Sequence, residues 1–125
     1  MELYMATPPV DRDALVELLD GDPDLVVIII NSFLGDCPDY MEAIREAVEN
    51  GDAEMLKREA HGLKGAAGSL RAQPACEAAT VLEEMGRSAD FTEAESALET
   101  LDHEIERLKE KLNALKAECQ EASGS

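Results

Sequence analysis

Residues 59–70, EAHGLKGAAGSL, bring together the side chains of this chain that are best suited to chemistry. They include His61, one of only two histidines, with Lys64 one helical turn further on and glycines at 62, 65 and 68. An imidazole with an unperturbed pKa of about 6.5 is a competent nucleophile near pH 7. A lysine ammonium neutralises oxyanions as a point charge. The combination predicts transfer of an anionic group such as phosphoryl, for which positioning and charge do most of the work.

A helical wheel places this histidine on the outward face of its helix. Leucines and alanines recur at steps of four and three residues and predict one buried stripe, formed by Leu56, Ala60, Leu63, Ala67 and Leu70. At 100° per residue, the stripe centres about 220° away from His61. The residues within about 60° of His61 are Lys57, Arg58, Lys64, Gly65 and Gly68.

Gly65 and Gly68 remove side chains from the surface next to the imidazole. Each costs a helix about 1 kcal/mol relative to alanine. Glycines that serve close helix packing belong on the buried face, whereas these two are predicted on the exposed face. We therefore expect a bare surface that lets the active site of another protein approach His61. The simpler alternative is a surface histidine without a role.

The charges around His61 differ from those of the whole chain. Residues 57–71 hold Lys57, Arg58, Lys64 and Arg71 against Glu59 alone, in a chain of net charge −17. A basic island on an acidic protein indicates a site for an anion or an acidic partner, although a chance distribution of charges stays an alternative. The overall acidity argues against nucleic acid or an anionic membrane as the main partner. No metal ligand stands three or four residues after His61, so no metal site is expected.

Composition and length favour one domain with an aliphatic core. The chain has 125 residues, of which 45% are hydrophobic and 3% are aromatic. It contains neither a run of about 20 apolar residues nor a basic and then apolar N-terminal segment. Cys37, Cys76 and Cys119 are odd in number and widely spaced, which favours reduced thiols. We therefore expect a cytoplasmic protein.

Turn residues and apolar spacing predict five or six helices and no sheet. After an extended arm at residues 1–10, Asp11 caps a short helix with one apolar side, formed by Ala14, Leu15, Leu18 and Leu19. A second helix starts at Pro23 and includes the β-branched run LVVIII, and the chain restarts at residues 36–38. Asn50-Gly51 ends the next helix.

The remaining breaks outline the second half of the chain. Asp52 caps the histidine helix, which runs to about Arg71, and Gln73-Pro74 opens another helix that ends near Gly86. The last helix begins at Phe91 or Thr92. The predicted architecture is an all-α, antiparallel, up-and-down four-helix bundle with an additional short N-terminal helix and a long C-terminal helix. The bundle domain is placed at residues 11–119 and a disordered tail at 120–125.

The last helix carries a sustained heptad pattern. Its apolar positions are Ala94, Leu98, Leu101, Ile105, Leu108, Leu112, Leu115 and Cys119. About 28 residues at 1.5 Å per residue give roughly 42 Å, which predicts an overhang beyond the bundle. We expect a monomer, with a dimer through this helix as the alternative.

The histidine stretch resembles the signature of histidine-containing phosphotransfer (HPt) domains, roughly HxLKG followed by small residues. The matching positions are His61, Leu63, Lys64 and Gly65, followed by Ala66, Ala67 and Ser69. Asn50-Gly51-Asp52 resembles the helix break that precedes the histidine helix in this family, and Leu82-Glu83 resembles a Leu-Glu or Leu-Gln pair on the next helix. The resemblance covers about residues 11–115.

This resemblance implies a phosphocarrier that shuttles a phosphoryl group between receiver-domain aspartates through His61. Lys64 supports the phosphate and Gly65 allows close docking. The partners are receiver domains of response regulators or hybrid histidine kinases. The chain itself lacks the GxxxxGK[ST] phosphate loop, so it is expected to be no kinase and to bind no cofactor, with magnesium on the partner.

Further residues are assigned to the docking surface, namely Lys57, Arg58, Gly68, Ser69, Arg71 and Glu83. Glu83 either accepts a hydrogen bond from His61 or is an ordinary surface acid. Arg71 departs from the family, which often has glycine at this position, and this charge is expected to alter partner choice. His103, between Asp102 and Glu104, is expected to be a solvated histidine without a role. A helical docking or dimerisation adaptor without covalent chemistry is the competing hypothesis.

Overall fold

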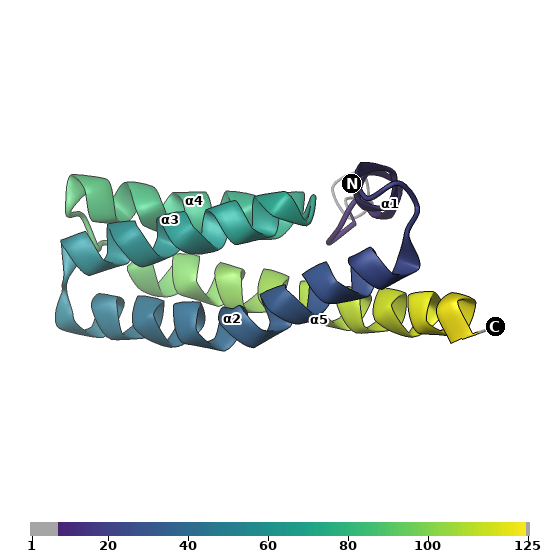
Figure 1. The fold of residues 1–125 in the computed structure, drawn as a ribbon. Coiled ribbons are helices and arrows are strands. Elements are labelled where there is room, and N and C mark those ends of the chain that lie inside the picture. Colours follow the sequence, from purple (N-terminus) through teal and green to yellow (C-terminus); the bar gives the residue numbers. More distant parts are fainter. Residues whose placement is uncertain (1–7, 125) are drawn as a thin grey trace.

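A computed structural model describes residues 8–124 of the chain, which form five helices and no strand in that range. The helices are α1 (Arg12–Leu18), α2 (Pro23–Asn50), α3 (Ala53–Ser69), α4 (Gln73–Ser88) and α5 (Ala94–Gly124). The helices α2 to α5 run side by side, each antiparallel to the next (Figure 1). The contacts α2–α3, α3–α4, α4–α5 and α2–α5 close the bundle. The predicted four-helix bundle with a short extra helix is confirmed.

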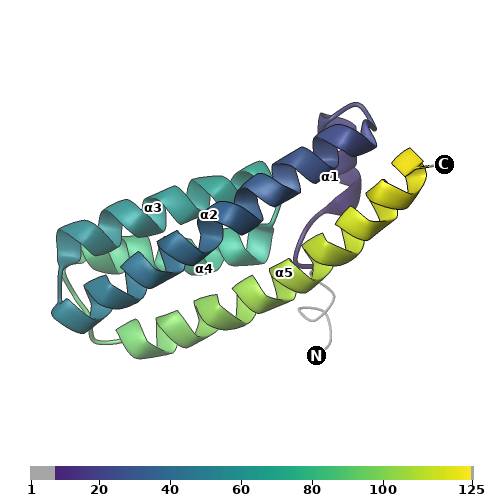
Figure 2. The ribbon, with the colours of Figure 1, turned by 60° about the horizontal axis from the view of Figure 1, so that its bottom comes forward.

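The short helix α1 lies at one end of the bundle. It lies beyond the ends of α3 and α4, beside the N-terminal part of α2 (Figure 1 and Figure 2). Of the four residues predicted to form its apolar side, only Leu15 is fully buried, and Leu18 is 53% exposed. A helix of two turns that packs over the end of the bundle can bury only one such side chain, so the prediction for Leu18 is wrong.

Aspartates cap three of the helices as their sequence contexts require. Asp11 accepts a hydrogen bond from Ala14 N–H at 3.0 Å, and Asp52 accepts one from Met55 N–H at 3.1 Å. Asp22 accepts one from Asp24 N–H at 3.0 Å, directly before Pro23 in the first turn of α2. These caps satisfy N–H groups that a helix leaves without partners. They fix where α1, α2 and α3 begin.

The predicted restart of the chain at residues 36–38 is wrong, because α2 continues through Pro38. A proline inside a helix removes one backbone hydrogen bond and costs about 3 kcal/mol. Burial on both sides of Pro38 offsets this cost, since Phe33, Cys37, Met41 and Ile44 all lie in the core. The ribbon of α2 changes direction part-way along its length (Figure 1). The run LVVIII is helical, as predicted.

The overhang of α5 is covered within the chain itself. Leu108, Leu112 and Leu115 are completely or almost completely buried. Lys116 Nζ lies 3.0 Å from Asn31 Oδ1 on α2, and Arg12 of α1 pairs with Glu118. The apolar stripe was therefore predicted correctly, whereas its proposed role in contacting a second chain loses its basis.

The ends of α5 differ from the predicted ones. Asp90 accepts hydrogen bonds from the backbone N–H and the hydroxyl of Thr92, which holds residues 90–93 in a turn and delays the helix to Ala94. At the other end α5 continues to Gly124, past residue 119, through residues predicted as a disordered tail. Glutamate, glutamine and alanine there favour helix. Ser125 lies outside the described residues.

The predicted arm is described only from Pro8 onward, and residues 1–7 lie outside the described part. Val10 is buried in the core, and the N–H of Asp11 donates to the carbonyl of Arg71 at 2.9 Å. The N-terminal approach to α1 is thus fixed to the turn between α3 and α4. Across the described residues, no helix combines the length and apolar character needed to cross a membrane.

Candidate functional site

The histidine helix α3 presents His61 to solvent, as the wheel predicted. Leu56, Ala60, Leu63 and Ala67 are fully buried against the core. The side chain of His61 stands on the other face and is 67% exposed. The leucine stripe thus sets the rotation of α3 about its axis, and that rotation decides where the imidazole points.

Glu83 on α4 lies beneath this imidazole. Its side chain is 3% exposed, and Nδ1 of His61 is 2.8 Å from its Oε2 atom. The sequence left open whether Glu83 contacts His61 or is a surface acid, and the structure shows the contact. Its position follows from Leu82 and Ala79, which are buried and turn this side of α4 toward the bundle.

Gly86 brings α4 close enough to α3 for this contact. A Cβ atom at Gly86 would lie 2.5 Å from the backbone nitrogen of Lys57 and 2.8 Å from the carbonyl oxygen of Ala53. Real Cβ atoms do not approach backbone so closely, so only glycine fits this crossing. Gly86 stands one turn after Glu83 and therefore sets the helix spacing at the site.

The contact with Glu83 fixes the tautomer of His61. Lys64 Nζ is 2.6 Å from Oε1 of Glu83, and this ammonium, followed by His61, holds the pKa of Glu83 at about 2 against the opposing effect of burial. The carboxyl group is therefore ionised at neutral pH and acts only as an acceptor. Nδ1 must then carry the proton and donate it to Glu83, which leaves the lone pair of the neutral ring on Nε2.

Arg87 also belongs to this cluster, and sequence reasoning missed it. Its Nη2 atom is 3.2 Å from Oε2 of Glu83, and its other Nη atom pairs with Glu84. Spacing could have found it, because a residue four positions after Glu83 shares the same face of α4. Glu83 therefore sits among His61, Lys64 and Arg87.

The glycines of α3 divide into two kinds. A Cβ atom at Gly65 or at Gly68 would meet no described atom within 4 Å outside its own helix. A Cβ at Gly62 would lie 2.6 Å from the Cε1 atom of Tyr40 on α2. Gly62 thus serves packing, whereas Gly65 and Gly68 only leave the surface bare, as the wheel predicted.

The other predicted docking residues are spread along α3 and its end. Lys57 pairs with Glu54 at 3.6 Å, and Arg58 pairs with Glu59 at 3.2 Å. Ser69 donates its hydroxyl proton to the carbonyl of Gly65 at 3.1 Å. Since Glu54 and Glu83 come from outside residues 57–71, the sequence overstated the positive charge of this island.

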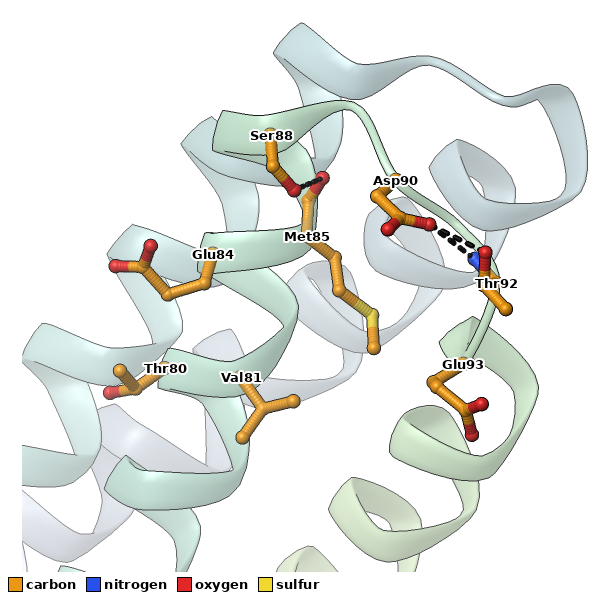
Figure 3. A pocket seen from close by; sticks show the side chains of 8 residues that line it. All are labelled: Thr80, Val81, Glu84, Met85, Ser88, Asp90, Thr92 and Glu93. Atoms are coloured by element: carbon orange, nitrogen blue, oxygen red, sulfur yellow. Dashed lines mark hydrogen bonds between the residues drawn. The ribbon is translucent and has the colours of Figure 1, made fainter.

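The remaining histidine is not part of this cluster, and a pocket beside α4 contains no residue of it. His103 is exposed, as predicted. Figure 3 shows a cavity of about 360 Å³ between α4 and the start of α5, which includes none of the residues in the His61 cluster. Its apolar side chains are Val81 and Met85. Within the described residues, no group of three or more His, Cys, Asp and Glu side chains is placed to hold a metal ion.

Comparison with known proteins identifies the family to which this arrangement belongs. The family model for the Hpt domain matches residues 29–111, about two thirds of the chain. The crystal structure of histidine-containing phosphotransfer protein B (HptB) from Pseudomonas aeruginosa PAO1 is similar in fold, with a TM-score of 0.80 at 23% sequence identity. The match covers 93% of this chain and 98% of that one. No curated protein sequence matches the chain significantly.

Proposed function

Because this chain belongs to the Hpt domain family and is a histidine phosphotransfer protein of a phosphorelay, we propose that Nε2 of His61 is the atom that carries the phosphoryl group. The observation that carries this proposal is the contact between His61 and Glu83. The carboxylate accepts a hydrogen bond from Nδ1–H, which keeps the proton on Nδ1 and leaves the unprotonated Nε2 on the solvent side of a ring that is 67% exposed. His103 has no such acceptor among the described residues.

The transfer step follows from this arrangement. The Nε2 lone pair attacks the phosphorus of an aspartyl phosphate on a receiver domain, the N–P bond forms, and the P–O bond to the aspartate breaks. The aspartate leaves as a carboxylate, and Nδ1 keeps its proton. The phosphorylated ring then bears positive charge, which the ionised Glu83 stabilises from 2.8 Å. The reverse reaction passes the group to the aspartate of a second receiver.

Lys64 and Arg87 are proposed to compensate the charge of the transferred group. Both are held at the site by Glu83, and their side chains are 31% and 52% exposed, so each can reach solvent beside the ring. Phosphoryl transfer places negative charge on three oxygens, and nearby cations stabilise it. Lys64 on α3 and Arg87 on α4 lie on the two helices that meet beneath His61.

Receiver domains are the partners of Hpt proteins, and the open backbone at Gly65 and Gly68 supports docking of such a domain over His61. Lys57, Arg58 and Ser69 are assigned to the same docking surface. Activation of the phosphodonor, including its magnesium, is assigned to the partner, so that the chain acts as a carrier without kinase activity of its own. A monomer in the cytoplasm is part of this proposal and is supported by the internally covered α5 and three unpaired cysteines.

The test is transfer of radiolabelled phosphate from a phosphorylated receiver domain. We expect a label on the chain that is labile in acid and stable in alkali, as a phosphoramidate bond requires. The label should be lost in His61→Gln and retained in the matched control His103→Gln. A label that persists in His61→Gln would refute the assignment. No observation favours the competing adaptor hypothesis, which predicts receiver binding without any label.

A further inference from the structure

Four helices of this chain end in the same backbone motif, and Arg71 occupies its most demanding position. In each case a residue at the helix end, either the C-cap or the residue after it, has a left-handed conformation, and two N–H groups bond back into the last turn. The four residues at this position are Asp20, Gly51, Arg71 and Ala89, with φ between 56° and 65°. At the end of α3, the N–H of Arg71 donates to Gly68 and that of Ala72 donates to Ala67, both at 3.0 Å. This is the Schellman arrangement, in which glycine is the usual residue.

An arginine at this position is unfavourable for the fold. The left-handed region brings Cβ too close to the following carbonyl, and a glycine avoids this clash. The side chain of Arg71 also makes no hydrogen bond or ion pair that would stabilise the fold within the described residues. The two structural contacts of Arg71 are made by its N–H and by its carbonyl, which accepts from Asp11. A glycine would make both.

The guanidinium of Arg71 is exposed and, within residues 8–124, takes part in no hydrogen bond or ion pair. The other cations of the basic island are paired, Lys57 with Glu54, Arg58 with Glu59 and Lys64 with Glu83. Arg71 is the member of the island whose charge is available to another molecule.

The distance from His61 suits a contact at the edge of a docked receiver domain. Ten residues separate Arg71 from His61, which is roughly 15 Å along a helix. A stable interface buries about 800 Å² on each partner, equivalent to a disc of roughly 16 Å radius. A partner centred on His61 therefore extends as far as Arg71 at the end of α3. Arg71 is too far from His61 to contact the reacting atoms themselves.

We propose that Arg71 is a specificity residue, which binds a carboxylate on the rim of the receiver domain that docks over His61. This inference rests on the proposed function. The planar guanidinium fits a carboxylate in a two-pronged contact, and the net charge of −17 disfavours a nucleic-acid phosphate as the occupant. A receiver that lacks the carboxylate gains nothing from Arg71, so the contact discriminates among receivers.

The experiment separates charge from backbone strain with three variants. Arg71→Gly removes both the charge and the strain, Arg71→Ala removes the charge alone, and Ala89→Gly relieves the same strain at the end of α4 without changing any charge. Each is assayed for thermal stability, for transfer from the receiver domain that labels the wild-type chain fastest, and for labelling by phosphoramidate, a small donor that needs no docking.

We expect both Arg71 variants to raise the receiver concentration at half-maximal rate about three- to tenfold with an unchanged maximal rate. Added salt should affect them less than the wild-type chain. Arg71→Gly and Ala89→Gly should each raise Tm by a few degrees, on the order of 3 °C, whereas Ala89→Gly should leave transfer unchanged. Phosphoramidate labelling should be equal in all four proteins.

Two results would overturn this inference while leaving the proposed function intact. One is wild-type transfer kinetics in both Arg71 variants. The other is impaired transfer in Arg71→Gly but not in Arg71→Ala, which would assign the effect to the backbone. If no receiver domain and no phosphoramidate labels His61, the proposed function fails and this inference fails with it.

Discussion

Nδ1 of His61 and Oε2 of Glu83 are 2.8 Å apart, although the two residues are 22 positions apart on different helices. The contact places an ionised carboxylate under an exposed imidazole. Glu83 is the buried charged residue of the core, and it is stable there because Lys64 and Arg87 also contact it. One carboxylate thus fixes the histidine tautomer and holds two cations beside the ring.

Replacing Glu83 should slow phosphorylation of His61, and the loss should depend on whether the new side chain can accept a hydrogen bond from Nδ1–H. Glu83→Gln keeps an oxygen acceptor for Nδ1–H, so the rate with phosphoramidate should fall less than about tenfold. Glu83→Ala removes the acceptor and frees the ring, and losses of about 10- to 100-fold are expected from misplacement alone. The measurement is the initial rate of acid-labile labelling. Equal rates in Glu83→Ala and the wild-type chain would contradict the positioning role.

Stability should depend on pH through Glu83. Its pKa is lowered from 4.5 to about 2, chiefly by Lys64, so its contribution is present above about pH 4.5 and is lost as pH falls toward 2. The largest loss that this shift allows is about 3 kcal/mol. Urea unfolding over this range should show a steeper loss for the wild-type chain than for Glu83→Gln. Glu84→Gln, which removes the adjacent exposed carboxylate, is the control and should follow the wild-type profile. Parallel profiles for wild type and Glu83→Gln would show that the carboxylate does not gain stability from its partners.

Lys64 should act on the transferred group in addition to stabilising the buried carboxylate of Glu83. Lys64→Ala should lower the phosphoramidate rate about 10- to 100-fold, because a cation beside the developing charge is lost, while Lys64→Arg should keep most of it. Lys57→Ala is the matched control, since Lys57 lies on the same face of α3 but pairs with Glu54. A similar loss in both alanine variants would point to general electrostatics instead of a specific contact.

The sequence predicted the face of each long helix because periodicity reports burial directly. The stripes of α3 and α5 are buried as expected, and the outward position of His61 follows from the first of them. Periodicity does not predict which residues of two helices contact each other. Glu83, which also binds Arg87, meets His61 only because α3 and α4 approach each other at Gly86. The local pattern of α4 does not predict that approach, so the role of Glu83 was left undecided. Arg87, whose spacing from Glu83 does indicate a shared face, was missed because Glu83 had not been placed at the site.

The errors in the predicted elements share one cause: local sequence preferences were outweighed by packing between helices. Pro38 predicts a break, yet the buried side chains of α2 before and after it keep the helix continuous. Leu112 and Leu115 would lie on an exposed overhang of α5 only if α2 were too short to reach them. Since α2 spans 28 residues, its N-terminal half packs beside the C-terminal half of α5, where these leucines are buried. The alternative of a dimer through this helix had been based on the expected overhang.

The glycines near His61 should respond to substitution in opposite ways. Gly65 has open space around it, so Gly65→Ala should raise the free energy of unfolding by about 0.5–1 kcal/mol. Gly65→Gln should leave the fold intact and phosphoramidate labelling unchanged, but it should slow transfer from a receiver domain at least about tenfold, because its side chain occupies the docking surface.

In contrast, Gly86→Ala forces a Cβ against the backbone of α3 and should lower stability by about 1–3 kcal/mol. Thermal unfolding and the two labelling assays read out all three variants. A stable Gly86→Ala would show that α3 and α4 can separate without penalty, and a Gly65→Gln chain with reduced Tm and normal receiver transfer would show that Gly65 serves packing instead of docking.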